Sequence, residues 1–329
     1  MNIAIITPFN SFSGGVESVN QILINLFKEE GHTINLVTSE NYSVTGFEKI
    51  LCKVIGLPYI TAKKFKPISK EFDLVIANGE FGWKIQHPLT INLFHGCFKG
   101  YRDLLKKMWP KKTLIKLAIG IYIQKKSARN KYVVAVSDFI KEILENDGIF
   151  VNRVIPNCVD TNKFYPQNII KKGNYLFVGS FNYYAKGFDL LEKIAEEGYK
   201  IFCITNQLPS SKLLWLKNVD NDNMPIIYNQ YKILLLPSRF EGMSMVVLEA
   251  MSCGIPVITS NVGIGPNLKK IIPEFVVESY NYKEYIARIK LIEKNYTFYS
   301  SEAIKFINNF HSFKVYKKSW LNLVEELIK

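Results

Sequence analysis

The chain has 329 residues, which is long for a single ordinary domain and suits two domains of about 150 residues each. Hydrophobic residues make up 48% of it and charged residues 22%, a balance that is typical of soluble globular proteins and excludes a mainly disordered chain. The formal net charge of +13 is unevenly distributed, because residues 99–131 contain eleven Lys or Arg and one acid.

The first half of the chain alternates buried-strand patterns with helical ones. The stretch 1–9 predicts a short buried strand, a glycine turn follows at 11–18, and apolar residues then recur at helical spacing up to Gly31. Helical stretches separate the further strands that we predict at 32–39, 72–79, 89–96 and 131–137. Strands that alternate with helices indicate a parallel sheet, so a Rossmann-like domain is expected.

The same alternation restarts after residues 153–166, which contain two prolines and resemble a linker. The patterns predict a helix at 187–200, a helical region at 282–329 that is broken near 310–312, and strands at 174–180, 201–205, 231–238 and 255–260. We therefore predict an α/β protein of two Rossmann-like domains, 1–158 and 159–311, with the C-terminal helix 312–329 packing back on the first. Open parallel sheets bind ligands at the carboxyl ends of their strands, so a cleft between the two domains is the expected site.

The five cysteines are scattered and form no C-x-x-C pair, so the pattern indicates neither a disulfide framework nor a zinc knuckle. A reducing, cytoplasmic compartment is expected. No apolar run has the length and flanks of a signal peptide or of a spanning helix.

Two glutamates interrupt an otherwise apolar stretch, "LLLPSRFEGMSMVVLEAMSCGIPVITS", at Leu234–Ser260. The pattern predicts a buried strand, a short loop, and a helix with Ser244 as N-cap that ends at Gly254. Glu241 then precedes the helix and Glu249 lies in its second turn, about 12 Å away at 1.5 Å per residue. That separation matches a nucleotide sugar from its ribose to its hexose.

The start of the predicted helix lies between the two acids. Helix N-termini favour phosphate, and the N–H groups concerned belong to Gly242, Met243, Ser244 and Met245. Each carboxylate is able to accept two hydrogen bonds from sugar hydroxyls. A solvated loop acid beside a structural glutamate explains the spacing equally well, so the residues alone leave both interpretations open.

The stretch "PSRFEGMSMVVLEAMSCGIPVITS" resembles the signature of family 4 retaining glycosyltransferases with the GT-B fold. Other parts of that family's pattern follow in order over residues 1–265, namely "SGGVES" at 13–18, "HG" at His95, "VS" at Val136, "VIPNCVD" at 154–160 and "FVGS" with "KG" between Phe177 and Gly187. The resemblance implies that the first domain lies on the acceptor side and that the second binds a nucleotide sugar.

The resemblance also implies roles for individual residues. Glu241 would contact the transferred sugar, Glu249 would bind the ribose, and His95 would touch the sugar or its developing positive charge. Lys186 would neutralise the leaving diphosphate, which is a metal's task in other transferases, so no metal is expected. The loop at Gly14 and Gly15 would add backbone contacts to the diphosphate.

Taken one by one, these residues have plainer explanations. The two glycines lack the full G-x-G-x-x-G pattern of dinucleotide sites, which disfavours NAD and leaves a structural turn open. Lys186 fits a solvated lysine, and His95 fits a structural histidine. We therefore rest their assignment on the resemblance.

The chain departs from the family pattern at several positions. Ser180 stands where many members have arginine, although a Gly-Ser version occurs among lipopolysaccharide core transferases, so one phosphate contact is weakened or replaced. Cys158 replaces a usual glycine, and Asn267 a common acid. The connection from Thr205 to Ile233, which frames the nucleobase, is short and leaves the base undecided.

The basic segment 99–131 interleaves its cations with apolar residues such as Met108, Trp109 and Ile115, and Pro110 divides it. It fits an interfacial helix pair on an anionic membrane surface, and it fits equally well helices that pack on their own domain. No nucleic-acid recognition motif accompanies the charge.

The sequence thus predicts a retaining, metal-independent transferase. It would move a hexose from a nucleoside diphosphate sugar, with UDP favoured over GDP, to a membrane-associated glycan such as a lipopolysaccharide core, capsule or glycolipid. Such an enzyme would be cytoplasmic and peripheral to the membrane. A nucleotide-sugar epimerase or hydrolase and a non-catalytic GT-B binding protein are the alternatives.

Overall fold

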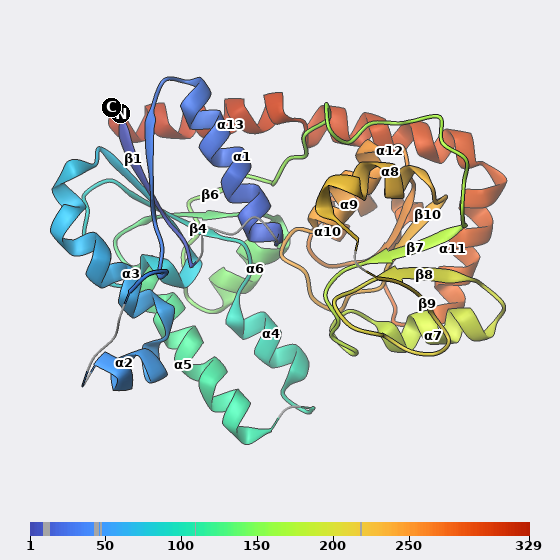
Figure 1. Ribbon diagram of the computed structural model, residues 1–329, viewed down its shortest axis with the longest axis horizontal. Coiled ribbons are helices and arrows are strands. Elements are labelled where there is room, and N and C mark those ends of the chain that lie inside the picture. Colours follow the sequence, from blue (N-terminus) through green and yellow to red (C-terminus); the bar gives the residue numbers. More distant parts are fainter. Residues whose placement is uncertain (9–13, 43–45, 47, 109, 218) are drawn as a thin grey trace. The chain divides into compact units, whose positions relative to one another are not determined.

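The computed structural model describes residues 1–8, 14–42, 46, 48–108, 110–217 and 219–329 (Figure 1). Two compact units are formed, Met1–Pro156 together with Trp320–Lys329, and Asn157–Ser319. The second unit begins two residues before the sequence-based boundary. The last helix, α13 (Phe313–Ile328), contributes its residues from Trp320 onward to the first unit.

The first unit is built on a parallel six-stranded sheet of order β2-β1-β3-β4-β5-β6. Its strands are β1 (Asn2–Ile6), β2 (Thr33–Val37), β3 (Leu74–Asn78), β4 (Thr90–Phe94), β5 (Tyr132–Ala135) and β6 (Arg153–Val154). β3 and β4 are buried along their whole length, which explains their continuous apolar sequences. The strand order reverses between β1 and β3, so the carboxyl ends of these strands mark the expected ligand-binding edge.

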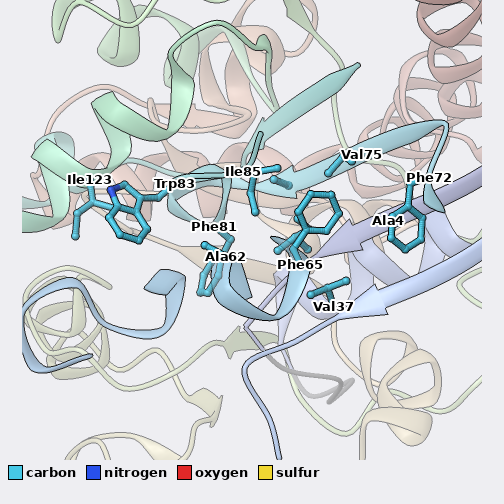
Figure 2. Packing of buried hydrophobic residues seen from close by; sticks show 12 residues of the cluster. Ala4, Val37, Ala62, Phe65, Phe72, Val75, Phe81, Trp83, Ile85 and Ile123 are labelled. Carbon is cyan, nitrogen blue, oxygen red and sulfur yellow. The ribbon is translucent and has the colours of Figure 1, made fainter. Parts of the chain in front are cut away.

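Helices cover this sheet. They are α1 (Gly15–Glu29), α2 (Glu48–Ile55), α3 (Leu57–Phe65), η1 (Lys66–Glu71), η2 (Gly79–Gly82), α4 (Phe98–Leu105), α5 (Lys111–Ala128) and α6 (Asp138–Asn146). Figure 2 shows the buried cluster in which Ala4, Val37 and Val75 of the strands meet Phe65 of α3. The same cluster includes Trp83 and Ile123, so α5 shares the core of its own unit.

The second unit has another parallel six-stranded sheet, of order β12-β11-β10-β7-β8-β9. Its strands are β7 (Tyr175–Val178), β8 (Ile201–Ile204), β9 (Leu214–Leu216), β10 (Ile233–Leu236), β11 (Val257–Ser260) and β12 (Val276–Val277). Counted within the unit and read from β9, this is the 3-2-1-4-5-6 order of the Rossmann fold. The order reverses between β7 and β10, where the loops after these strands meet.

The helices of the second unit pack on its sheet and on one another. They are α7 (Phe188–Glu196), η3 (Asn221–Asn223), α8 (Met224–Asn229), α9 (Met245–Ser252), α10 (Gly265–Ile271), η4 (Pro273–Phe275), α11 (Tyr282–Lys294) and α12 (Tyr296–Phe310), followed by the start of α13. α7 packs against α11, and α9 packs against α12. His311 Nδ1 lies 2.8 Å from the Asn157 carbonyl oxygen, which ties the end of α12 to the beginning of the unit.

The structure confirms the predicted fold class and adds three short strands. The region interpreted as a linker contains β6, and β9 and β12 extend the second sheet at its edges. The C-terminal helical region is broken at Asn295 as well as at the predicted site near Phe310. None of the helices in the described ranges is both long and apolar enough to cross a membrane.

Candidate active site

Two loops of the second unit meet at the point where its strand order reverses. The loop after β7 runs from Gly179 to Gly187 and carries Ser180 and Lys186, and the loop after β10 carries Glu241. Lys186 Nζ lies 2.6 Å from Glu241 Oε1, and the two side chains are only 21% and 14% exposed. The predicted phosphate-neutralising lysine and sugar-binding glutamate therefore form one partly buried ion pair.

Close backbone packing holds Lys186 at this point. The N-cap of α7 is Gly187, whose φ of 73° lies in the left-handed region that favours glycine. A side chain at this position would also collide with the carbonyl oxygen of Pro237 in the other loop. The lysine that precedes Gly187 is thereby fixed against the loop after β10, while Ser180, near the start of the same loop as Lys186, is exposed.

Arg239, in the loop after β10, is bonded to the loop after β7 and to the start of α7. Its backbone N–H donates to the Ala185 carbonyl (2.8 Å), and its guanidinium donates two bonds to Asp189, of 2.6 and 2.7 Å. The guanidinium also stacks between two aromatic rings, 4.0 Å from the centre of Tyr184 and 4.9 Å from that of Tyr280. Sequence reasoning missed this residue, although an arginine between a buried strand and a glycine loop is itself a signal, because arginine is buried only with partners.

The helix start that was predicted to hold phosphate is present. α9 begins at Met245 with Ser244 at the N-cap position, as expected, but the serine side chain makes no capping hydrogen bond. The first N–H groups of a helix have no intrahelical acceptor, so this end carries partial positive charge. Met243 is fixed by its sulfur, which accepts from Asn157 N at 3.2 Å. Gly242, Met243, Ser244 and Met245 thus lie between the Glu241 carboxylate and the helix, in the predicted order.

Glu249 lies further along α9 and is bound to a buried tyrosine. The Tyr228 hydroxyl donates to Glu249 Oε2 at 2.7 Å. Burial raises the pKa of the Glu249 carboxyl to about 7, and the tyrosine bond and Lys163 act in the opposite direction. One carboxylate oxygen is therefore fixed by the protein, which orients the other for hydroxyl donors of a ligand. Tyr228 is a second residue that the sequence analysis did not find, since it lies 21 positions away in α8.

The first unit orients His95 through a chain of hydrogen bonds. Asn20 Nδ2 donates to Thr7 Oγ1, Asn78 Nδ2 donates to Asn20 Oδ1, and His95 Nε2 lies 2.9 Å from Asn78 Oδ1. With the Asn78 oxygen facing the ring, as the amides are oriented here, the proton of the neutral imidazole is assigned to Nε2, which donates to Asn78 Oδ1. Burial lowers its pKa to about 4, so the ring is neutral near pH 7.

The other ring nitrogen of His95 has no hydrogen-bond partner among the described residues. Nδ1 is enclosed and accepts no hydrogen bond from any residue in the described ranges. A neutral imidazole with a free Nδ1 lone pair accepts a hydrogen bond from a hydroxyl. His95 follows β4, and Asn78 ends β3 at the reversal of strand order, so both lie at the expected ligand-binding edge of this unit.

The glycine turn of the first unit forms the start of α1. Gly14 is the N-cap and Gly15 the first residue of the helix, whereas Ser13 of the same motif lies outside the described residues. A side chain at position 14 would collide with the Glu17 carboxylate, which lies over the first turn. An acid at a helix start is stabilised by the same N–H groups that the resemblance assigns to a phosphate.

The predicted residues therefore fall into two groups. Lys186, Glu241 and the start of α9 come together in the second unit, with Ser180 in the same loop as Lys186 and Glu249 on α9. Gly14, Gly15 and His95 belong to the first unit.

The two carboxylates of an Asp-x-Asp tripeptide at 220–222 are bonded to other groups of the protein. Asp220 caps η3 by accepting from Asp222 N at 3.2 Å, and Asp222 pairs with Lys163 at 3.0 Å. In the part of the chain that the structure describes, no group of three or more His, Cys, Asp or Glu side chains is arranged to hold a metal ion.

Comparisons with known proteins relate the second unit to a family and the whole chain to a fold. Residues 162–309 match the model of the family "Glycosyl transferases group 1". An uncharacterized glycosyltransferase of Methanocaldococcus jannaschii is 25% identical over 85% of this chain and 83% of its own length. An uncharacterized protein of the cps region of Klebsiella pneumoniae is 28% identical over 52% of each chain, so this chain spans about half of that relative.

Solved structures share the fold over nearly the whole chain. Sucrose-phosphate synthase from Thermosynechococcus elongatus has a TM-score of 0.80 at 15% identity and covers 99% of both chains. Anabaena HepE in complex with UDP-glucose has a TM-score of 0.72 at 15% identity, with 99% of this chain and 100% of that one covered. WaaG, a glycosyltransferase involved in lipopolysaccharide biosynthesis, has a TM-score of 0.71 at 14% identity over 96% and 98%. Residues 162–309, most of the second unit, therefore match the glycosyl transferases group 1 family, and the whole chain has the GT-B fold of solved glycosyltransferases.

Proposed function

We propose that this chain is a retaining glycosyltransferase that moves a hexose from a UDP-sugar to a membrane-associated glycan or glycolipid in the synthesis of cell-surface polysaccharide. The observation that carries the proposal is the ion pair of Lys186 and Glu241 beside the start of α9, at the reversal of strand order. The UDP-glucose complex of HepE supports the donor, and WaaG and the cps-region relative support the acceptor class.

The geometry supports a division of labour at the donor. The start of α9 and the Lys186 ammonium offer positive charge to the diphosphate, and they stabilise it most as it leaves with two electrons from the glycosidic bond. Glu241 then accepts hydrogen bonds from sugar hydroxyls, and the free oxygen of Glu249 accepts from the ribose. These contacts fix both ends of one ligand on a single loop and helix.

The proposed chemistry needs no protein nucleophile. As the bond to the diphosphate breaks, a phosphate oxygen takes the proton of the acceptor hydroxyl, which attacks the sugar on the same face and so retains its configuration. His95 Nδ1 accepts a hydrogen bond from a sugar hydroxyl, which fixes the orientation of the ring. We propose a metal-independent reaction because Lys186 and the helix start supply the positive charge at the phosphates.

The acceptor side of the proposal includes contact with an anionic membrane. The C-terminal half of α5 packs on its own unit through Ile121 and Ile123, whereas Ile115 and Met108 are exposed, at 61% and 54%. Exposed lysines lie near these two residues in the sequence, at positions 106, 107, 111, 112 and 116. Exposed apolar and cationic side chains together favour an anionic lipid surface. Trp109, which was part of the predicted pattern, lies outside the described residues.

Calorimetric titration with UDP-, GDP- and ADP-sugars tests the donor, and product analysis with and without a lipid-linked glycan tests the reaction. UDP-sugar binding that is weakened in Lys186→Ala and unchanged in Lys200→Ala, an exposed lysine after α7, supports the proposal. Release of free nucleotide or an epimerised sugar without any acceptor favours an epimerase or hydrolase instead. Failure of every nucleotide sugar to bind favours a non-catalytic protein.

A further inference from the structure

A cavity of about 580 Å³ lies in the first unit. Its walls come from the segment between β3 and β4 and from the end of α5 with the turn into β5. Four of the lining residues are cationic, namely Lys84, Lys126, Arg129 and Lys131, and no lining residue in the described ranges is acidic. We call this cavity the basic pocket.

The basic pocket is separate from the candidate active site. Its residues precede β4 and β5, so they lie at the amino ends of these strands, whereas His95 follows the carboxyl end of β4. The strands are parallel, and the two ends belong to opposite edges of the sheet. The roles proposed for His95 and Asn78 therefore do not account for the basic pocket.

Aromatic rings hold two of the cations in place. Lys84 Nζ lies 4.8 Å from the centre of the Trp83 ring, and Lys126 Nζ lies 5.4 Å from that of Tyr122. Trp83 is itself anchored in the buried cluster together with Ile123 of α5 (Figure 2). A cation–π contact on the anchored Trp83 ring restricts where the Lys84 ammonium lies, which prepares it for a ligand.

The backbone on both sides of the basic pocket is left-handed. Lys84 has φ of 53° and Asn130 has φ of 54°, and a lysine in this region is uncommon, because only glycine, asparagine and aspartate adopt it readily. The turn at Asn130 turns Arg129 and Lys131 toward the same cavity. Strained backbone of this kind is concentrated at binding sites.

The described residues provide no counter-ion for the cations of the basic pocket. No carboxylate in the described ranges forms an ion pair with Lys84, Lys126, Arg129 or Lys131, although the neighbouring Lys125 pairs with Asp147 at 2.9 Å. The side chain of Lys131 is partly enclosed, and burial lowers its pKa. Like charges that converge on one cavity repel one another, so an anion from outside the chain would stabilise them.

We propose that the basic pocket binds the phosphoryl group of a phosphate ester. A phosphate monoester carries close to two negative charges and three acceptor oxygens, which match the ammonium groups and the guanidinium. The Trp83 and Tyr122 side chains would contact the rest of the ester. This inference does not depend on the proposed function, since it uses none of the donor-site residues.

The test uses the full chain and two soluble probes, glycerol 1-phosphate and glucose 6-phosphate, in calorimetric titrations. Arg129→Gln with Lys131→Gln should weaken binding by about tenfold or more. The matched control is Lys66→Gln with Lys70→Gln, which removes the same charge from exposed lysines of η1 and should change little. Arg129→Lys with Lys131→Arg keeps the charge and should retain most of the affinity, which separates binding from folding.

Two further arms identify the source of the phosphoryl group and exclude the donor site. Co-sedimentation with vesicles of phosphatidylglycerol and phosphatidylcholine assigns a lipid headgroup if it is weaker in the double Gln variant than in the wild type and is competed by glycerol 1-phosphate. If the soluble probes bind and neither effect is seen, the ligand is a soluble ester. Probe binding must persist in Lys186→Ala. No binding of either probe, equal binding by the double Gln variant, or equal loss in the control overturns the proposal.

Discussion

Lys186 and Glu241 lie 55 positions apart in the chain, and their side chains form an ion pair of 2.6 Å. Because both groups are mostly shielded from water, removal of either leaves a partly buried charge without its partner. We expect Lys186→Met and Glu241→Gln each to destabilise the protein, and the double variant to lose about 1–3 kcal/mol less than the sum of the two. Urea unfolding of the four proteins measures this coupling.

The matched control for this cycle is Lys200→Met combined with Glu241→Gln, whose effects should add. Additive losses in the Lys186 and Glu241 cycle would contradict a stabilising pair.

Replacing Arg239 by lysine should destabilise the protein even though the positive charge is kept. Lysine cannot reproduce the two parallel bonds to Asp189 or the stacking between Tyr184 and Tyr280, so we expect Arg239→Lys to cost about 1–3 kcal/mol of unfolding free energy. The variant should also bind a nucleotide sugar more weakly, because Arg239 holds the loop that carries Lys186. Chemical denaturation and calorimetry give the two values.

Two variants check this interpretation of Arg239. Asp189→Asn removes the partner of the same interaction and should produce a similar loss. Arg288→Lys on α11 removes an arginine for which the described structure gives no hydrogen bond or ion pair, and it should have little effect. If Arg239→Lys is as stable as the wild type and binds the nucleotide sugar with unchanged affinity, the contacts of the Arg239 guanidinium are not needed to hold the loop.

Local sequence patterns predicted the strands and helices around the site, because these elements are determined by residues that are close together in the chain. The apolar run before Pro237 forms β10, and Ser244 occupies the N-cap of α9. The strands that were missed are β6, β9 and β12, which have only two or three residues and therefore show no periodicity. Their pairing depends on neighbouring strands, and no local signal reports it.

The partners of the site residues could not be predicted from the sequence for a related reason. Asp189 for Arg239, Tyr228 for Glu249 and Asn78 for His95 are brought together by strand order and register, which spacing along the chain does not specify. The basic segment shows the same limit, since Ile121 and Ile123 are buried while Ile115 is exposed on the same helix. Composition indicated cations and apolar residues, but only the fold separates the packed half of α5 from the exposed half.

The protonation of His95 should depend on Asn78. In the wild-type protein the ring is expected to titrate near pH 4, because burial disfavours the imidazolium. Asn78→Asp places a carboxylate beside Nε2, which favours the charged ring and should raise the pKa of His95. NMR titration of the imidazole Hε1 signals, assigned with His95→Gln, measures the change.

His32 provides an internal reference in the same spectra. It lies beside the N-terminal amine, 3.3 Å away, and shares no bond with Asn78, so its titration should not change in Asn78→Asp. A wild-type His95 that titrates near 6.5 would contradict the enclosed, neutral ring.

Glu249 should make stability fall as the pH rises. Its carboxyl has a pKa of about 7 in the folded protein against an ordinary 4.5, so between these values the folded state binds more protons than the unfolded state. Stability contributed by this group is then lost with increasing pH, by roughly 2–3 kcal/mol from pH 5 to pH 8. Burial lowers the pKa of His95 and His311 to about 4, which acts in the opposite direction below pH 6.5 and is present in wild type and variant alike.

The difference between Glu249→Gln and wild type therefore isolates the carboxyl. Urea unfolding at several pH values from 5 to 8 measures the free energy of unfolding of both proteins. The value for Glu249→Gln should increase relative to that of the wild type as the pH rises, because glutamine has no proton to lose. Tyr228→Phe removes a hydroxyl that donates to the carboxylate, so it should raise the pKa of Glu249 further and make the loss with pH steeper. If the difference between Glu249→Gln and wild type stays constant over this range, the carboxyl is ionised throughout, and the enclosed environment assigned to it is wrong.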